Sequence, residues 1–156
     1  MRTPPRVIGL ISDTHGLIRP EALAALRGVE HILHAGDVGS PDVLDALRAV
    51  AAVTAVRGNN DRGPWARRLA AMASIDVAAT QVLVIHDRHD LGTDTRGAAI
   101  VISGHSHRPL IERRDGVLFV NPGSAGPRRF RLPIAVARLV VRADGVDAEI
   151  VELAVG

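Results

Sequence analysis

Residues 6–16 read RVIGLISDTHG, and this stretch indicates the fold class. Arg6 to Ser12 is almost continuously apolar, which is typical of a strand buried on both faces. The loop Asp13-Thr14-His15-Gly16 follows it, and a helix is expected from about Pro20 to Arg27. A buried strand that leads through a polar loop into a helix is the first step of an α/β fold.

Two further steps of the same kind follow. Residues 31–35, HILHA, predict a second strand that ends at Gly36-Asp37. Residues 41–50 begin with Pro-Asp after a serine, which is a typical helix start. Residues 52–57 predict a third short strand, which leads into Gly58-Asn59-Asn60-Asp61. Strands that alternate with helices predict a largely parallel sheet.

The second half of the chain changes character, because its strands follow one another without long helices between them. Asp115-Gly116 and Asp144-Gly145 each separate two apolar segments, and Asp-Gly is a strong hairpin signal. No internal repeat or linker interrupts the chain, so residues 1–156 are expected to form one α/β domain. The strands expected in this half are residues 74–77, 81–85, 98–103, 110–113, 117–121, 134–142 and 146–153.

Composition excludes several classes of site and partner. The chain has no cysteine, so a metal must be held by imidazole, carboxylate or amide groups. The apolar run Val7 to Ile11 is too short for a membrane span or a signal segment, and we expect a cytoplasmic protein. The pI of about 10.7 arises because lysine, cysteine and tyrosine are absent, so a net charge of only +2 persists to high pH. It is therefore weak evidence for nucleic acid as a partner.

Polar side chains follow the predicted strands at their carboxyl ends, where α/β sheets bind ligands. Glycines in the same loops let the backbone turn tightly beside them, namely Gly16, Gly36, Gly58 and Gly104. We expect the polar residues to meet at one edge of the molecule. They are Asp13, His15, Asp37, Asn59, His86, His105 and His107.

The chemistry of this set predicts two divalent cations. Imidazole suits Zn, Fe, Ni and Cu, whereas carboxylate and amide oxygens suit Mn and Mg. Four histidines, two aspartates and one asparagine are too many for one tetrahedral ion and enough for two, with Asp37 as the natural bridging carboxylate. Two-metal sites with ions about 3.5–4 Å apart are typical of phosphatases and nucleases. We expect Mn²⁺, with Fe, Ni, Co or Zn as alternatives.

Each of these residues also has a plain structural interpretation. Asp13 alone is a common residue of a turn after a strand, and Asn59 or Asp61 is a common helix N-cap. A lone histidine is more often a satisfied polar group than a ligand, and we assign His31 and His34 to that class. Asp61 is expected to buttress its loop. For the seven residues as a set, a metal site is the better interpretation.

Five motifs of the chain, in their order, resemble the signature of the calcineurin-like metallophosphoesterases. They are Asp13-x-His15, Gly36-Asp37, Gly58-Asn59-x-Asp61, His86 and Gly104-His105-x-His107. Residues 121–124, Asn-Pro-Gly-Ser, are similar to a segment of the small bacterial and archaeal phosphodiesterases of that family. The resemblance implies a four-layer αββα sandwich, in which two packed mixed β-sheets are flanked by helices. It also implies one ion held by Asp13, His15, Asp37 and His107, and another held by Asp37, Asn59, His86 and His105.

Two departures from that family's pattern bear on the mechanism. The more active monoesterases carry a histidine directly after the ligand asparagine, where it protonates the leaving oxygen, and here that position is Asn60. General acid catalysis is typically worth about 10²–10⁴-fold. We therefore expect a phosphodiesterase whose metal-activated hydroxide attacks phosphorus in line but which assists the leaving group poorly. Asp87 replaces the usual glycine, and His89 beyond it is a candidate substitute acid.

The remaining expectations concern substrate and partners. Arg57, Arg128 and Arg129 are candidates to bind the phosphate of a small ester substrate, although an exposed arginine is usually only solvated surface. No membrane partner is expected, while nucleic acid and a homo-oligomer stay open. The alternative to an enzyme is a non-catalytic, metal-binding interaction module that resembles the small subunit of retromer, which also lacks the acid histidine. All expected metal ligands are present here, which favours the enzyme.

Overall fold

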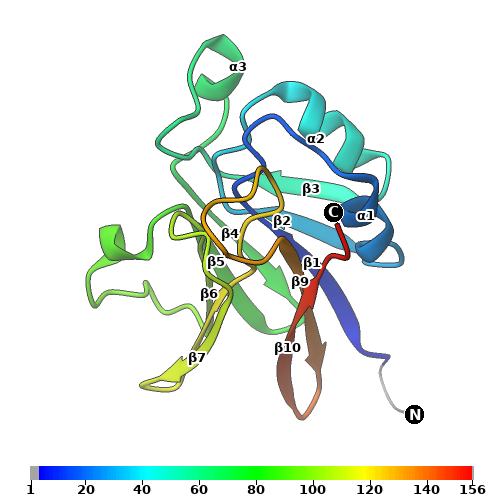
Figure 1. Ribbon diagram of the computed structural model, residues 1–156. Helices are drawn as coiled ribbons and strands as arrows, with labels where there is room; N and C mark the ends of the chain where they lie inside the picture. The colour runs from blue at the N-terminus through cyan, green and yellow to red at the C-terminus, as the bar shows by residue number, and fades with distance from the viewer. Residues whose placement is uncertain (1–3, 156) are drawn as a thin grey trace.

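The computed structural model describes residues 4–155 and shows two five-stranded β-sheets packed against each other (Figure 1). The strand order is β10-β9-β1-β2-β3 in the first sheet and β4-β5-β6-β8-β7 in the second. The first contains β1 (Arg6–Ile11), β2 (His31–His34), β3 (Ala52–Ala55), β9 (Ala135–Arg142) and β10 (Gly145–Glu152). The second contains β4 (Met72–Val77), β5 (Thr80–Ile85), β6 (Ile100–Ile102), β7 (Leu110–Arg114) and β8 (Val117–Asn121).

Short helices follow the strands of the first sheet. They are α1 (Pro20–Ala25), α2 (Pro41–Arg48) and α3 (Pro64–Arg67), and a 3₁₀-helix, η1 (Arg88–Leu91), follows β5. Ser40 caps α2 by accepting a hydrogen bond from the Asp42 N–H at 3.1 Å, as the sequence predicts. Within residues 4–155, no helix is long and apolar enough to cross a membrane.

Parallel pairing brings the carboxyl ends of several strands to one edge. β1 pairs in parallel with β2, and β2 with β3, so Ile11, His34 and Ala55 lie side by side. In the second sheet, β5, β6 and β8 are parallel. β9, β10, β4 and β7 pair antiparallel with their neighbours. Each sheet is therefore mixed and presents a group of parallel strand ends on which ligand loops can be mounted.

Aliphatic side chains fill the space between the sheets. Ile8 and Leu10 of β1 belong to one buried cluster with Val84 of β5 and Ile102 of β6. A second cluster lies between the first sheet and its helices, where Leu26 and residues of α2 are buried. Burial of such surface contributes roughly 25 cal/mol per Å² and holds the layers in register.

The expected four-layer sandwich is confirmed, with a thin outer layer on the second sheet. A small cluster that includes Leu83 and Val101 lies on that face, and Leu91 of η1 packs against it. Only residues 86–99 connect β5 to β6, so this layer contains one turn of 3₁₀-helix instead of a long helix. The bounds of every expected strand and helix agree with the structure to within two residues, whereas α3 and η1 were not expected.

His34 is buried at the end of β2 and ties the loops after β1 and β2 together. Its Nδ1 accepts a hydrogen bond from the Gly36 N–H at 3.1 Å, so Nε2 carries the proton and donates to Thr14 Oγ1 at 3.0 Å. His31 also has a partner, since its Nε2 lies 2.8 Å from Thr54 Oγ1. The expectation that both histidines are satisfied polar groups is confirmed.

The pKa of His34 leads to a measurable pH dependence of stability. Burial lowers this pKa from 6.5 to about 4, so between those values the unfolded chain takes up a proton that the folded protein does not. The contribution of His34 to the free energy of unfolding is therefore full above pH 6.5 and falls by up to about 3 kcal/mol as the pH drops to 4. We expect urea denaturation of chelator-treated protein to show this loss.

His34→Asn is the matched control, because its Oδ1 can replace Nδ1 as the acceptor for the Gly36 N–H but does not titrate. The loss of unfolding free energy on going from about pH 6.5 to about pH 4.5 should be smaller in this variant by about 2 kcal/mol. Equal losses in the two proteins would contradict a neutral, buried His34.

Candidate metal centre

All seven expected ligands lie beyond the carboxyl ends of parallel strands. The first sheet supplies Asp13 and His15 after β1, Asp37 after β2 and Asn59 after β3. The second sheet supplies His86 after β5, and His105 and His107 after β6. The two sets meet where the sheets pack together, since the N–H of His105 donates to Asp13 Oδ2 at 3.1 Å.

Most of these residues have a backbone conformation that residues other than glycine rarely adopt. Five have φ between 48° and 72°, in the left-handed region, where the Cβ costs about 1–2 kcal/mol per residue. Strain of this kind persists only where the surrounding contacts impose it, and it is typical of functional sites. The five are Asp13, His15, Asp37, His105 and His107.

Asp13, His15 and His107 form the first candidate ion site, in which each residue offers a ligand atom within 4.8 Å of the others. The Nε2 of His107 lies 3.4 Å from Asp13 Oδ1 and 3.4 Å from His15 Nε2. Asp37 Oδ2 lies 3.8 Å from His15 Nε2. The four residues that the family resemblance implies for one ion are therefore together.

His86 lies at the centre of the second candidate ion site. Three oxygens surround its Nε2, namely Asn59 Oδ1 at 2.9 Å, Asp37 Oδ2 at 3.3 Å and Asp13 Oδ1 at 3.9 Å. The Nδ1 of His105 lies 3.2 Å from the same Asn59 oxygen. Asp37 Oδ2 is thus close to a histidine of each site, as a bridging carboxylate must be.

Buried atoms without a partner show that a cation fits this place. Within residues 4–155, Asp13 Oδ1 and His107 Nδ1 are buried and have no hydrogen-bond partner. The other oxygen of Asp13 is held, because Ser12 Oγ donates to Oδ2 at 2.7 Å. His86 Nδ1 donates to the Ala35 carbonyl at 2.8 Å, which leaves Nε2 directed at the carboxylates. Since buried polar atoms need partners, a divalent cation would satisfy Asp13 Oδ1.

The electrostatics of the cluster also favour positive charge. Burial acts to raise the pKa of Asp13, but the nearby imidazole of His107 and the hydrogen bond from Ser12 outweigh it and leave the pKa below its usual value. For Asp37, hydrogen bonds from His86 and Asn60 likewise overcome burial and lower the pKa. Burial acts to lower the pKa of His86, yet Asp37 and Asp13 more than offset this and raise it. Both carboxylates are therefore ionised, and they stabilise a positive charge between them.

Asp61 supports the ligand loops, as the sequence predicts. Its carboxylate accepts hydrogen bonds from the backbone N–H groups of Gly58 at 2.9 Å, Gly39 at 2.9 Å and Val38 at 3.2 Å. These bonds join the loop after β3 to the loop after β2, and thus fix Asn59 relative to Asp37.

Two further supporting residues were not expected from the sequence. Ser12 holds Asp13, and Asn121 Nδ2 donates to the Gly104 carbonyl at 3.0 Å. Gly104 lies close to Ser12 and Asp13. A Cβ at this position would collide with Ser12 Oγ and would lie 2.6 Å from Asp13 Oδ2. Asn121 begins the Asn-Pro-Gly-Ser segment that the sequence singles out, and Ser12 ends the first apolar strand, but only the structure reveals the contacts that these side chains make.

Asn60 occupies the position of the missing acid and is bound to Asp37. Its backbone N–H donates to Asp37 Oδ1 at 2.8 Å, and its side-chain Nδ2 donates to Oδ2 at 3.0 Å. The amide therefore orients a carboxylate of the cluster and has no acidic proton to give to a leaving group.

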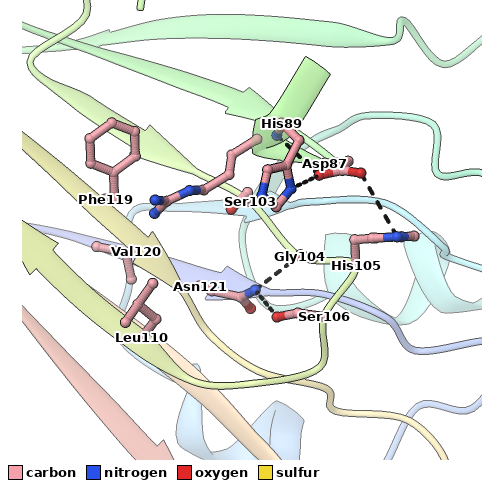
Figure 2. Close-up of a pocket in the computed structure, with 11 residues that line it drawn as sticks. Asp87, His89, Ser103, Gly104, His105, Ser106, Leu110, Phe119, Val120 and Asn121 are labelled. Atoms are coloured by element: carbon pink, nitrogen blue, oxygen red, sulfur yellow. Dashed lines mark hydrogen bonds and ion pairs between the residues drawn. The ribbon is translucent and has the colours of Figure 1, made fainter. Parts of the chain in front are cut away.

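His89 is linked to the cluster through Asp87 (Figure 2). Its side chain is 88% exposed, and its Nδ1 lies 2.9 Å from Asp87 Oδ1. Asp87 Oδ2 lies 3.8 Å from His105 Nε2. Figure 2 shows both histidines beside the Asp87 carboxylate, where they line a cavity of about 210 Å³. His89 therefore reaches the candidate ligand His105 only through Asp87 and does not contact it directly.

A larger cavity of about 420 Å³ opens beside the second ion site. Asn59, His86 and His105 line it together with Arg57 and Arg96. Arg57 was expected near the phosphate, whereas nothing in the sequence distinguishes Arg96 among the arginines of the chain.

The other two candidate arginines are placed differently from each other. Arg128 is engaged within its own loop, since its Nη1 donates to the Leu132 carbonyl at 3.1 Å. Burial lowers the pKa of His15 although Asp37 and Asp13 act to raise it, and the charge of Arg129 adds a small further lowering. Of the two, Arg129 is thus the one within electrostatic reach of the cluster.

The sequence and the fold are similar to those of several known proteins. The sequence model of one protein family, the calcineurin-like phosphoesterase superfamily domain, matches residues 7–144. A probable metallophosphoesterase of Methanothermobacter thermautotrophicus is 38% identical, over 93% of this chain and 91% of its own length.

Two solved structures extend the comparison to the fold. An archaeal phosphodiesterase has a TM-score of 0.77 and 22% identity, over 93% of this chain and 99% of its own. Vps29 of Entamoeba histolytica, in a complex with Zn²⁺, has a TM-score of 0.71 and 23% identity, over 94% of this chain and 98% of its own. At these identities the likeness concerns the fold alone.

Ser12 allows a test of the metal centre that leaves every candidate ligand in place. Ser12→Ala removes the hydroxyl that donates to Asp13 Oδ2. Loss of such an outer hydrogen bond typically weakens metal binding about 10–100-fold. We expect this decrease in the affinity for Mn²⁺, measured by calorimetric titration of chelator-treated protein.

The matched control is Ser40→Ala, which removes the N-cap hydroxyl of α2 and touches none of the cluster. It should lower the free energy of unfolding by about 1 kcal/mol and leave the affinity for Mn²⁺ at the wild-type value. If Ser12→Ala bound Mn²⁺ as tightly as the wild type, Asp13 could not be a ligand that Ser12 holds in place.

Proposed function

This chain belongs to the calcineurin-like phosphoesterase superfamily, and we propose that it is a phosphodiesterase that depends on two divalent cations. The observation that carries the proposal is the convergence of imidazole, carboxylate and amide groups from both sheets, with contacts from 2.9 to 3.9 Å. A mixed nitrogen and oxygen donor set of this size exceeds the needs of one ion. We propose Mn²⁺ as the metal, with Fe, Ni, Co or Zn as alternatives.

The candidate ligands divide between two ions. Asp13, His15, Asp37 and His107 would hold one, and Asp37, Asn59, His86 and His105 would hold the other. Two cations bound there would lower the pKa of a water molecule and neutralise the charge of the phosphoryl oxygens. Asp13 and Asp37 are ionised and buried, so they attract cations in surroundings where charges interact strongly.

Basic groups beside the cluster support an anionic ester as the substrate. Arg129 is near the first ion site, while Arg57 and Arg96 line the cavity of about 420 Å³ beside the second. A guanidinium can donate paired hydrogen bonds to phosphate oxygens. Met72 and Leu91 give the same cavity apolar walls, so one organic group of a phosphodiester can be accommodated there.

Protonation of the leaving oxygen is the weak part of the mechanism. Asn60 donates its amide hydrogen to Asp37 and has no acidic proton to transfer. In our proposal water supplies the proton, and His89 is the alternative donor. Because His89 is largely exposed and its Nδ1 faces Asp87, the enzyme should favour esters whose leaving groups need no proton.

A non-catalytic, metal-binding interaction module is the alternative function, and the likeness in fold to Vps29 fits it. Loss of some of the metal ligands would favour such a module. Here all seven candidate ligands are present and each lies within 3.9 Å of another. This favours the phosphodiesterase.

Hydrolysis of bis-p-nitrophenyl phosphate tests the proposed function. Chelator-treated protein should be inactive, and added Mn²⁺ should restore turnover. Asp37→Asn should reduce kcat/KM by more than about 100-fold, because it removes the charge that both ions share. Asp76→Asn, at an exposed position of β4, should match the wild type. No turnover with Mn, Fe, Ni, Co or Zn would favour the interaction module.

Asn60→His should supply the missing acid. We expect the rate on a dialkyl phosphate to rise by about 10–100-fold, which is part of the usual gain from a general acid. The rate on bis-p-nitrophenyl phosphate should rise far less, because nitrophenolate departs without a proton. The backbone N–H of residue 60 can keep its hydrogen bond to Asp37 Oδ1 in this variant.

His89→Asn is the comparison that separates the two proton donors. It should change either rate by less than about twofold if water is the donor. Equal gains on the two substrates in Asn60→His would show that proton transfer does not limit this enzyme.

A further inference from the structure

The connection between β8 and β9 presents an aromatic side chain for which the fold has no use. Residues 126–133, the tip loop, read GPRRFRLP and lie in the orange part of the chain in Figure 1. Phe130 in this loop is 92% exposed, and its φ of 53° is rare for a bulky residue. An exposed ring on a strained backbone stabilises neither core nor turn, and such outliers indicate function.

The tip loop is built on the loop that carries Asp13 and His15. Just before it, the Ala125 N–H donates to the Ser12 carbonyl at 3.1 Å, and Ser124 Oγ donates to the Asp13 carbonyl at 3.0 Å. A Cβ on Gly126 would lie 2.5 Å from the Asp13 carbonyl oxygen, so the two segments are in close contact. The base of the tip loop is therefore fixed to the first ion site.

The end of the tip loop is a closed turn. The Leu132 N–H donates to the Arg129 carbonyl at 3.1 Å, and Arg128 Nη1 donates to the Leu132 carbonyl at 3.1 Å. Phe130 and Arg131 occupy the two central positions of this turn. The ring is thus presented to solvent by a defined backbone.

The arginines on either side of Phe130 are free to bind an anion. Arg129 and Arg131 are exposed. Within residues 4–155, neither has a carboxylate within 4.0 Å; the arginines that do are Arg6, Arg48, Arg88, Arg114 and Arg142. The tip loop therefore offers an aromatic face and unpaired guanidinium groups close to the metal centre.

We propose that the tip loop binds a nucleoside phosphodiester, with the base stacked on Phe130 and a phosphate oxygen bound by Arg129. The proposal rests on the proposed phosphodiesterase function and names the substrate class of that site. Every nucleobase has an aromatic face, and a ring with nearby arginines is the usual platform for single-stranded or nucleotide ligands. A phosphoester without an aromatic group would use the arginines but not Phe130.

A lipid surface is the less favoured ligand. Binding to a bilayer needs several apolar side chains around the inserted ring. Among the described residues, the other exposed large apolar side chains are Leu17, Leu110 and Ile111, and the last two lie on β7 in the second sheet. The tip loop itself contributes one exposed ring among three arginines.

Two diesters with the same leaving group test the proposal. The two esters are thymidine 5′-p-nitrophenyl phosphate and methyl p-nitrophenyl phosphate. In the second, a methyl group takes the place of the nucleoside. We expect Phe130→Ser to lower the ratio of their kcat/KM values by about 10-fold, and Phe130→Trp to preserve it. Ile111→Ser, which also removes an exposed apolar side chain, should keep the wild-type ratio. Fluorescence anisotropy of a labelled oligothymidylate with chelator-treated protein should show a similar loss of affinity in Phe130→Ser alone.

The outcomes separate the two proposals. If the methyl ester is hydrolysed but neither the ratio nor the anisotropy depends on Phe130, the nucleoside proposal is wrong and the phosphodiesterase stands. If the wild type hydrolyses neither ester with any of the metals, the phosphodiesterase and its substrate class are both wrong. Phe130-dependent sedimentation with phosphatidylglycerol vesicles, with an unchanged ratio, would assign the tip loop to a membrane and overturn the nucleoside proposal.

Discussion

Two ionised carboxylates buried at one edge of the molecule, Asp13 and Asp37, impose the constraint on which the rest of the structure depends. A charge removed from water must be compensated nearby, and both sheets contribute to that compensation. Ser12 and Asn60 donate to the carboxylates, and the histidines approach them from strands of both sheets. The close packing leaves no room for side chains at Gly58 and Gly104, where a Cβ would collide with Asp37 and Ser12. The two sheets must therefore pack in one relative position, because any other would leave a buried charge without its partner.

The cost of this arrangement is large on the scale of protein stability. Five candidate ligands have left-handed backbone conformations, which at about 1–2 kcal/mol each amount to about 5–10 kcal/mol. The net stability of a domain is about 5–15 kcal/mol. Aliphatic burial between the sheets and hydrogen bonds such as those of Asp61 and His34 must offset most of that strain. The function of the fold at this edge is thus to hold polar groups in positions that an isolated loop would not adopt.

Features of the fold and of the metal centre could be predicted where the residues that determine them are neighbours in the sequence. Apolar runs and Asp-Gly turns predict the strands to within two residues, and motif spacing predicts that the ligands meet. The support for the ligands is not local, since Ser124 contacts the Asp13 carbonyl across 111 positions and Asn121 contacts the Gly104 carbonyl across 17. The exposure of Phe130 also contradicts the general preference of phenylalanine for the core, so periodicity could not predict it. The assignment of ligands to individual ions stays a prediction.

The left-handed conformation of the ligands has an evolutionary consequence. At most positions with positive φ, replacement by glycine or asparagine relieves strain and raises stability. Glycine at His15, His105 or His107 would relieve this strain, whereas at Asp13 and Asp37 it would also leave the donors of Ser12, Asn60 and His105 without an acceptor. The three histidines thus keep a strained backbone that glycine would relax, so the chemistry of their side chains explains their presence and the stability of the fold does not.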